Sequence, residues 1–353
     1  MIIYWIIFSF ITAFVVVVFG TPSLIKVAKL KRLVDEPSED RKIHSRSVPT
    51  IGGIMIFSAF IFSACLWYPE SLKDMNAGLN DLKYLIATLI LLFFVGIKDD
   101  IIGTAPIYKL VAHLIVGFII VMMADIRIES LHGLFGVTET LPVWASVLLT
   151  IFVYIVVVNA FNLIDGIDGL AAGIGFIITL FYTFWFYHID QPDLALISMS
   201  LCGALGGFLV FNFSPARIFM GDSGSLIIGA IVVVLTLRAI EIDVPQTSFF
   251  NNVSQPVLAM AVLSYPLIDT LRVFVIRAIA GKSPMSADRN HIHHRLLDNG
   301  FNHKKTVLIL YAFTILVILM AVFVPFPNPT WRFLATALFS IALIGLIFLI
   351  SRK

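Results

Sequence analysis

Residues 153–170 read VYIVVVNAFNLIDGIDGL and join an apolar run to a group of polar side chains. The run 153–158 has the composition of the end of a membrane span, and Asn159, Asn162, Asp165 and Asp168 follow it. Carboxylates at a membrane boundary are costly unless they are paired, hydrated or bound to a cation. A solvated helix end is the simpler interpretation for one such residue. Two amides and two carboxylates together favour a polar site at the mouth of a membrane helix.

The composition of the whole chain is that of a membrane protein. Hydrophobic residues make up 59% of the 353 residues and charged residues only 13%, whereas soluble domains carry roughly one-quarter charged residues. Apolar segments of about 20 residues, long enough for a roughly 30 Å hydrocarbon core, recur along the chain. We therefore predict a single all-α integral membrane domain over 1–353 with about 11 transmembrane helices. The expected spans lie near 2–19, 51–68, 82–97, 107–124, 142–158, 170–187, 193–213, 225–241, 256–277, 306–324 and 331–350.

The basic residues indicate how the chain lies across the membrane. An odd number of spans puts the termini on opposite faces, and Lys and Arg concentrate in the cytoplasmic loops. If the N-terminus is outside, only Lys73, Lys83, Arg127, Arg238 and Arg332 of the 24 Lys and Arg fall outside. We therefore expect the N-terminus outside and the C-terminus in the cytoplasm. The net charge of +2 gives no indication of a nucleic-acid partner.

Polar clusters fall in every expected inner loop. The loops are 20–50, 98–106, 159–169, 214–224 and 278–305, and their clusters read DEPSEDRKIHSRSVPTIGG, KDDIIG, NAFNLIDGIDG, FNFSPARIFMGDSGS and ADRNHIHHRLLDNG. The outer loops carry nothing comparable. We therefore expect the chemistry of the protein in its cytoplasmic loops.

The polar residues of 159–169 share one face if the fifth span continues as a helix past Val158. Asn162, Asp165 and Gly169 then stand at positions i, i+3 and i+7, with Asp168 three residues beyond Asp165. Such a face would point into a polar cleft.

KDDIIG places two carboxylates side by side at the inner end of the third span. Asp99 and Asp100 cannot both ionise cheaply unless a cation lies nearby. Lys98 is one candidate for that cation. The other is a divalent metal, because Mg²⁺ commonly takes one or two protein carboxylates and completes its shell with water and substrate phosphate.

Asp222 lies in the sequence GDSG, residues 221–224, which is similar to the nucleophile stretch of trypsin-like proteases. We interpret this similarity as chance, since such a protease needs a β-barrel and a positioned His and Asp. The motif here opens an expected membrane helix, where backbone amides favour anions. Asp222 should therefore face a cation or a donor on a ligand.

Histidines and arginines dominate DRNHIHHRLL, residues 288–297. His291, His293 and His294 lie together with Arg289 and Arg295. Zinc is one interpretation, but no cysteine accompanies the histidines and two of them are adjacent. Arg and His on an inner loop are better suited to binding phosphate or a developing negative charge.

Further candidates lie outside these motifs. Arg272, within the ninth expected span, needs an anion, which either Asp269 or a substrate phosphate could supply. Asp35 and His44 lie in the first inner loop, near the PTIGG that opens the second span.

The clusters together describe phosphoryl chemistry at the cytoplasmic membrane surface. A site at this position favours a lipid substrate, and a lipid monophosphate is largely dianionic at pH 7 and already nucleophilic. A metal and basic side chains would reduce the repulsion between two anionic substrates. No Walker GxxxxGK[ST] sequence occurs, and exchanging one phosphoanhydride for another needs no ATP.

The five clusters, in this order, resemble those of the polyprenyl-phosphate N-acetylhexosamine 1-phosphate transferases, glycosyltransferase family 4. The resemblance covers residues 20–300. Within the family, HIHHRLL is similar to the bacterial undecaprenyl-phosphate N-acetylglucosamine 1-phosphate transferases. The muramoyl-pentapeptide branch carries three consecutive histidines, which Ile292 interrupts here, and usually has Thr where Ile164 stands.

The resemblance implies an enzyme of the bacterial inner membrane. It would transfer N-acetylglucosamine 1-phosphate, or a related N-acetylhexosamine 1-phosphate, from the UDP-sugar to undecaprenyl phosphate and release UMP. Membrane lipids would surround it, and a homodimer is compatible with the family. The sugar and the downstream polymer stay open.

The resemblance also implies functions for individual residues. It places Mg²⁺, or Mn²⁺, at Asp222, with Asn162 close to the metal and the diphosphate. Asp35 and His44 would lie near the lipid phosphate. The implied catalytic residues are Asp99, Asp100, Asp165, Asp168, Arg272, His291, His293 and His294, and the implied substrate contacts are Asp35, His44, Asn159, Asn162, Asn212, Phe219 and Arg289.

The nucleotide would lie beside the fifth and seventh spans. The family places Asp165 and Asp168 on the nucleotide side of the site, and Asn212 and Phe219 would flank the uracil. The sugar and the diphosphate would lie against the histidines and Arg272.

Two rivals come from other classes of protein. A transporter of an anionic metabolite would place its binding groups near the bilayer midplane, between repeats. An intramembrane aspartyl protease would need two aspartates facing each other within spans, and only Asp269 lies that deep.

Overall fold

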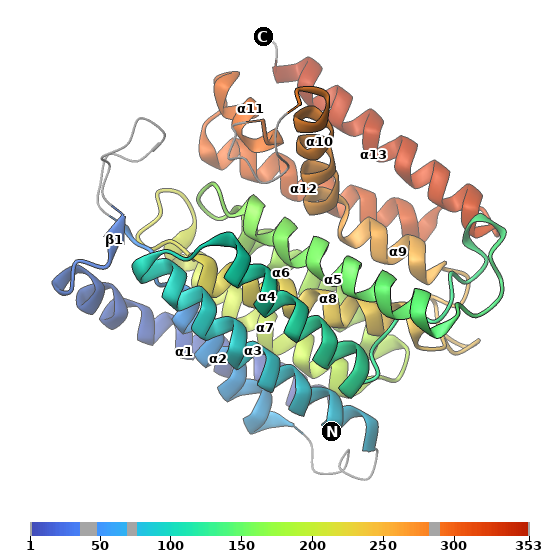
Figure 1. Cartoon of the computed structure of the whole chain (residues 1–353), viewed down its shortest axis with the longest axis horizontal. Helices are drawn as coiled ribbons and strands as arrows, with labels where there is room; N and C mark the ends of the chain where they lie inside the picture. Colours follow the sequence, from blue (N-terminus) through green and yellow to red (C-terminus); the bar gives the residue numbers. More distant parts are fainter. Residues whose placement is uncertain (1, 36–47, 69–75, 282–289, 352–353) are drawn as a thin grey trace.

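A computed structural model describes residues 2–35, 48–68, 76–281 and 290–351 of the chain. The described residues are almost entirely helical, which confirms the all-α prediction (Figure 1). The helices are α1 Ile2–Leu30, α2 Gly53–Trp67, α3 Asn76–Ile102, α4 Pro106–Phe118, α5 Val143–Ile164, α6 Leu170–His188, α7 Pro192–Asn212, α8 Asp222–Glu241, α9 Gln255–Val262, α10 Ser264–Ile279, α11 Ile292–Asp298, α12 His303–Phe323 and α13 Pro329–Ser351. A π-helical turn, Ile119–Met123, extends α4.

Helices suit this composition because lipid offers no hydrogen bonds, so each backbone group must be satisfied within its own segment. Large apolar side chains accordingly face outward. Phe94, Leu148 and Phe152 are each more than 60% exposed, which is expected for a surface in contact with lipid. The prediction of a multi-pass membrane protein is confirmed by these helices.

Eight helices in the described part of the chain are long and apolar enough to cross a membrane, or nine if the bent pair α9–α10 crosses as one. α2 has only 15 residues, short of the roughly 20 that a full crossing needs. α3 has 27 residues, with the polar KDD sequence just before its last two residues, and is not one of these eight. Each expected span coincides with a helix or a helix pair. The number of crossings and the orientation stay predictions.

α8 is the central helix of the bundle. It packs against α2, α3, α5, α6, α7 and α9. Of the residues in its most apolar 18-residue segment, 94% are buried. Figure 1 shows it behind α4 and α5, with α1 and α2 to one side. Because neighbouring helices surround the start of α8, any polar residue there can contact several of them.

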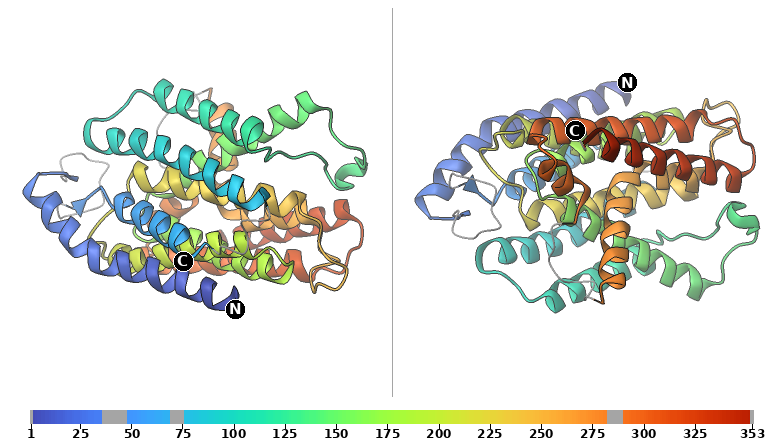
Figure 2. Two further views of the ribbon diagram at one scale, coloured as in Figure 1. Left: turned by 90° about the horizontal axis from the view of Figure 1, so that it is seen from below. Right: turned by 90° about the horizontal axis from the view of Figure 1, so that it is seen from above.

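α10 departs from the direction of the other helices. It follows α9 with a bend of 71°, and Figure 2 shows α10, in orange, standing across the remaining helices. It packs against α5 and α12. The bend therefore brings α10 and the short α11 toward the end of α5, where the opening sequence motif lies.

A short antiparallel pair of strands precedes α2. β1 Val34–Asp35 pairs with β2 Val48–Pro49, and Asp35 stands opposite Val48. The next residues run beside the chain that enters α8: Gly52 N donates to Phe219 O at 2.9 Å, and Phe219 N donates to Pro49 O at 2.7 Å. This pairing fixes the backbone just before Asp222.

Candidate active site

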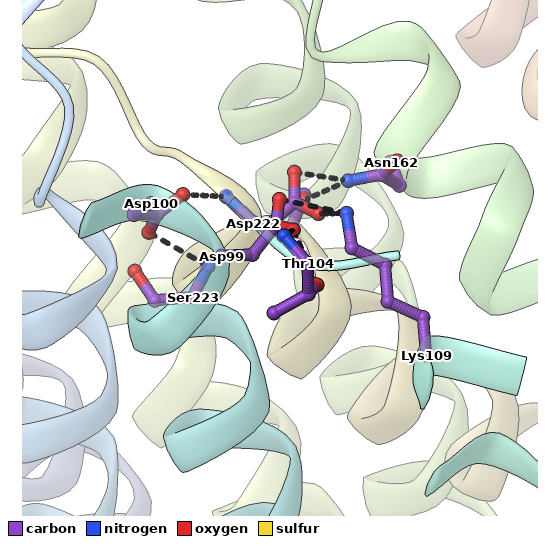
Figure 3. Close-up of polar contacts among 8 residues, drawn as sticks. Asp99, Asp100, Thr104, Lys109, Asn162, Asp222 and Ser223 are labelled. Atoms are coloured by element: carbon purple, nitrogen blue, oxygen red, sulfur yellow. Dashed lines mark hydrogen bonds and ion pairs between the residues drawn. The ribbon is translucent and has the colours of Figure 1, made fainter. Parts of the chain in front are cut away.

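Four helices bring five polar residues together (Figure 3). Asp99 and Asp100 follow the apolar part of α3, Lys109 lies in α4, Asn162 lies in the last turn of α5, and Asp222 begins α8. We call these five residues the carboxylate centre. Four of them come from three motifs that lie far apart in the sequence, and Figure 3 shows the side chains converging on Asp222.

Asp222 contacts α4 and α5 through its two carboxylate oxygens. Oδ1 accepts a hydrogen bond of 2.8 Å from the amide of Asn162, and Oδ2 accepts one from the ammonium of Lys109. Asn162 also donates to the hydroxyl of Ser225 at 3.0 Å. The structure thus brings together the two residues that the family resemblance assigned to the metal.

Asp100 binds the first amides of α8. Its Oδ1 accepts from Asp222 N at 2.7 Å and its Oδ2 from Ser223 N at 3.1 Å, two of the helix N-terminal donors that have no partner within the helix. The predicted anion at this helix end is therefore a side chain of the protein itself. Burial raises the pKa of Asp100 to about 6, although these hydrogen bonds oppose the rise.

Gly221 lets this carboxylate approach the helix. Its φ is +72°, and a Cβ there would lie 2.2 Å from Thr50 O and 2.6 Å from Asp100 Oδ2. Any other residue would collide with both groups. The glycine of the GDSG motif is thus required by geometry.

Lys109 belongs to this centre but was not among the predicted site residues. Its ammonium lies 2.7 Å from Asp99 Oδ2 and also contacts Asp222. Lys98, one of the two candidate cations for the acidic pair, instead has its ammonium 5.9 Å from the ring centroid of Tyr108, and Lys109 is the ammonium that contacts Asp99. The signal for Lys109 was a lysine inside an expected span, where an ionisable residue is functional by default.

Asp99 is held by the loop that follows α3. Its Oδ1 accepts from the backbone N of Thr104 at 2.8 Å and from the hydroxyl of Thr104 at 2.5 Å. Burial favours the neutral form of Asp99, but the hydrogen bonds from Lys109 and Thr104 outweigh burial and lower its pKa. Asp99 and Asp100 therefore have different environments: one faces an ammonium and the other faces helix amides.

Asp165 and Asp168 lie in a turn, which corrects the expectation of one continuous helical face. α5 ends at Ile164, and α6 begins at Leu170 after Gly169 with φ +80°. Asp168 Oδ2 accepts from Ala216 N at 3.0 Å. Burial, followed by the negative charges of nearby carboxylates including Asp222, raises the pKa of Asp165 well above its usual value.

Asn212 fixes the same turn. Its side chain accepts from Gly169 N at 3.0 Å and donates to Ile218 O at 2.9 Å, and it is 3% exposed. Both ends of the amide are therefore engaged in structure. Its predicted contact with uracil stays a prediction, as does that of Phe219, whose side chain is half-buried.

The histidines form a second cluster against this turn. His291 Nδ1 lies 2.8 Å from Asp269 Oδ2, and His293 is fully buried. A Cβ at Gly166 would lie 2.7 Å from His293 Nε2. Because Gly166 stands between the two aspartates of the turn, this contact joins the histidine cluster to the acidic residues.

The remaining predicted residues are placed as follows. Arg272 donates to the carbonyl of Asn290 and its guanidinium lies 5.5 Å from the ring of Phe348. Asn159 donates to Ile155 O at 2.7 Å within α5. The ring of His294 lies next to those of the other two histidines. The predicted residues His44 and Arg289 lie outside the described residues, and of Asp35 the strand pairing alone is described.

The side-chain oxygens of the carboxylate centre are of the kind that bind a hard divalent cation. Carboxylate and carboxamide oxygens are the ligands that Mg²⁺ prefers. Lys109 contacts two of these carboxylates at once, so a positive charge already lies against their oxygens. Asp222 and Asn162, which contact each other at 2.8 Å, are the side chains of the centre that could hold such an ion.

The fold and this site define a multi-pass membrane protein with a carboxylate-rich centre at the ends of its helices. The family model "Glycosyl transferase family 4" matches residues 82–240, the segment that carries all five residues of the centre. The chain also aligns over most of its length with curated proteins whose names describe phosphosugar transfer to polyprenyl phosphates. The chain belongs to glycosyl transferase family 4.

Three relatives illustrate the similarity. The decaprenyl-phosphate N-acetylglucosaminephosphotransferase of Mycobacterium tuberculosis strain H37Rv is 31% identical over 90% of this chain and 82% of its own length. A protein of Bacillus subtilis named "Probable undecaprenyl-phosphate N-acetylglucosaminyl 1-phosphate transferase" is 32% identical, covering 87% of this chain and 81% of its own. The undecaprenyl-phosphate alpha-N-acetylglucosaminyl 1-phosphate transferase of Yersinia pestis is 29% identical, covering 91% and 85%.

Proposed function

We propose that the protein transfers N-acetylglucosamine 1-phosphate, or a related N-acetylhexosamine 1-phosphate, from a UDP-sugar to a polyprenyl phosphate. The products are a lipid diphosphate sugar and UMP. The names of the family members supply the sugar phosphate and the lipid acceptor. The observation that carries the proposal is the position of Asp222, between Lys109 and Asn162 on neighbouring helices.

In this reaction an oxygen of the lipid phosphate attacks the phosphorus that bears the sugar. The bond from that phosphorus to the bridging oxygen breaks, and UMP carries away the electron pair. The main obstacle is the repulsion between two anions, so catalysis depends on positioning and electrostatic stabilisation. Lys109 supplies a fixed positive charge, and Asp100 holds the amides of α8 so that Asp222 keeps its direction.

A divalent cation, Mg²⁺ or Mn²⁺, completes the proposal. Held by Asp222 and Asn162, it would neutralise the charge of the diphosphate. Lys109 would remain beside Asp99, with which it shares a hydrogen bond of 2.7 Å.

The proposed location is the bacterial inner membrane, with the site on its cytoplasmic face. The residues of the centre stand at the ends of α3 and α5 and at the starts of α4 and α8. A transporter would hold its ligand near the middle of its helices, so this position disfavours that rival. Asp269 binds a histidine and a backbone amide, which disfavours the aspartyl protease.

Mass spectrometry of the lipid product tests the proposal. Purified protein would be incubated with undecaprenyl phosphate and, in separate reactions, UDP-N-acetylglucosamine, UDP-N-acetylgalactosamine or UDP-N-acetylmuramoyl-pentapeptide. We expect a lipid diphosphate sugar from UDP-N-acetylglucosamine and none from the muramoyl-pentapeptide. A product from the muramoyl-pentapeptide alone would assign the protein to the other branch.

A further inference from the structure

We propose that Asp269, on α10, is a positioning residue that fixes the protonation pattern of His291 and directs its Nε2 toward the ligand. The inference rests on the proposed function, because the ligand is the diphosphate sugar. Asp269 Oδ2 lies 2.8 Å from His291 Nδ1, and Oδ1 accepts from Ile292 N at 2.6 Å.

Asp269 is buried, so its carboxylate depends on these two hydrogen bonds. The side chain is 0% exposed, and a buried carboxylate must have partners for its oxygens. The two hydrogen bonds supply one partner for each oxygen. One of them satisfies the first amide of α11, so Asp269 also fixes where this helix begins, one residue after His291.

The chemistry of the pair decides which nitrogen carries a proton. An ionised carboxylate only accepts hydrogen bonds, so the facing Nδ1 of His291 must be the donor. Nε2 then points away from Asp269, whether the ring is neutral or charged. The side chain of His291 keeps 6% of its surface exposed, so the residue is not fully sealed from its surroundings.

His291 lies close to the acidic turn. Its ring is nearly parallel to that of His293, with centroids 5.4 Å apart, and His293 in turn meets Gly166. One ring therefore separates His291 from the turn that carries Asp165 and Asp168. The 71° bend before α10 brings Asp269 to this place.

A metal site is the competing interpretation of the same residues. One ligand atom each from Asp269, His291 and His293 lies within 4.8 Å of the others, and such a set is compatible with zinc. The positioning function is favoured because Asp269 Oδ1 accepts from the backbone amide that begins α11, a structural partner that a metal ion would not replace. Measuring the zinc content of the purified protein distinguishes the metal site from the positioning function.

Asp269→Asn is the informative variant. Its oxygen can still accept from Ile292 N, but its amide nitrogen is a donor and forces Nδ1 of His291 to accept. The ring must then carry its proton on Nε2. Exchanging a carboxylate for an amide behind a histidine imposes the wrong tautomer in this way, and we expect kcat to fall by at least about tenfold. Thr270→Val, a change of similar size on the same helix at a buried hydroxyl that makes no hydrogen bond within the described part of the chain, is the matched control and should retain kcat.

Nitrogen NMR of histidine-labelled protein reads the tautomer without any turnover, with the His291 signals identified by their loss in His291→Ala. We expect protonated Nδ1 in the wild type and protonated Nε2 in Asp269→Asn. In a double-mutant cycle, Asp269→Asn should lower kcat little further once His291 is Ala, because the two act as a unit.

An unchanged tautomer in Asp269→Asn, independent effects in the cycle, or stoichiometric zinc that this variant loses would overturn the inference. If the wild type shows the expected tautomer but releases no UMP from any UDP-sugar, the proposed function fails while the Asp269–His291 pair stands.

Discussion

Asp222 shows how a single carboxylate gains a function from its neighbours. Its two oxygens face an amide and an ammonium from different helices, while its backbone is fixed by Asp100. Replacing it by Asn removes the charge and keeps the shape. We expect UMP release to fall on the order of 10²- to 10³-fold, comparable to the loss of one preorganised electrostatic group.

The control for that variant is Asp243→Asn, since Asp243 is exposed and far along the chain. It should retain full activity, and both variants should unfold near the temperature of the wild type. Full UMP release by Asp222→Asn would remove Asp222 from the metal site.

Lys109 competes with a divalent cation for the same carboxylates. Replacing it by Met frees the oxygens of Asp99 and Asp222 that it now contacts. We therefore expect Lys109→Met to bind Mg²⁺ more tightly in the absence of substrate but to release UMP much more slowly. Calorimetric titration with Mg²⁺ measures the first effect. Lys98→Met, an exposed lysine on the neighbouring helix, should change neither, and weaker Mg²⁺ binding by Lys109→Met would contradict the assignment.

A substitution at Gly166 tests the contact between the histidine cluster and the turn that carries Asp165 and Asp168. A Cβ there would lie 2.7 Å from His293 Nε2, whereas one at Gly345 would meet nothing within 4 Å. Gly166→Ala should thus push His293 away and lower the free energy of unfolding by about 1–3 kcal/mol, with a loss of activity. Gly345→Ala should be neutral or slightly stabilising. Equal thermal stability and activity for both would mean that the contact is unimportant.

At the scale of elements, the start of α8 links pH to activity. Asp100 has its pKa raised from 3.8 to about 6, so the folded protein binds this proton more tightly than the unfolded chain. Protonation therefore stabilises the fold below about pH 4, and this contribution is lost as the pH rises through about 6. Activity should follow the opposite course, because protonated Asp100 binds the amides of α8 less well.

The measurement is the rate of UMP release and the thermal stability, both recorded from pH 5 to pH 8. The acidic fall in rate should be shallower in the profile of Asp100→Asn, which takes up no proton at this position, whereas the lipid phosphate still does so at about pH 6 in both proteins. If the rate of the wild type falls only where the protein unfolds, Asp100 does not control it.

The helices could be predicted from the sequence because their apolar segments have the length of a membrane crossing. The clusters could be predicted because polar residues at such segment ends are costly. The sequence did not indicate which of the polar clusters contact each other in the folded protein. The turn at Asp165 breaks the expected helical face, and Gly169, with φ +80°, lets the chain reverse between α5 and α6. The pairing of Asp269 with His291 depends on the bend before α10. Pro266, in the first turn of α10, is a local signal for a break in the helix, but it does not indicate which residues the bent helix will contact.

At the scale of the whole molecule, orientation is the main open prediction. The basic residues predict that the loop 125–141 is outside and the segment 278–305 is inside. Single cysteines at Thr138 and Asp298, both exposed, would be introduced after Cys65 and Cys202 are replaced by Ser. An impermeant thiol reagent on intact cells should label the first position and spare the second. The reverse pattern would place the active site outside.

The central claim concerns the reaction itself, and the release of UMP by the purified protein tests it most directly. The protein would be given UDP-N-acetylglucosamine, undecaprenyl phosphate and Mg²⁺, with each omitted in turn. The account predicts UMP only when all three are present, in amounts equal to the lipid diphosphate sugar formed. UMP release that needs no lipid, or that persists after chelation of the metal, would contradict it.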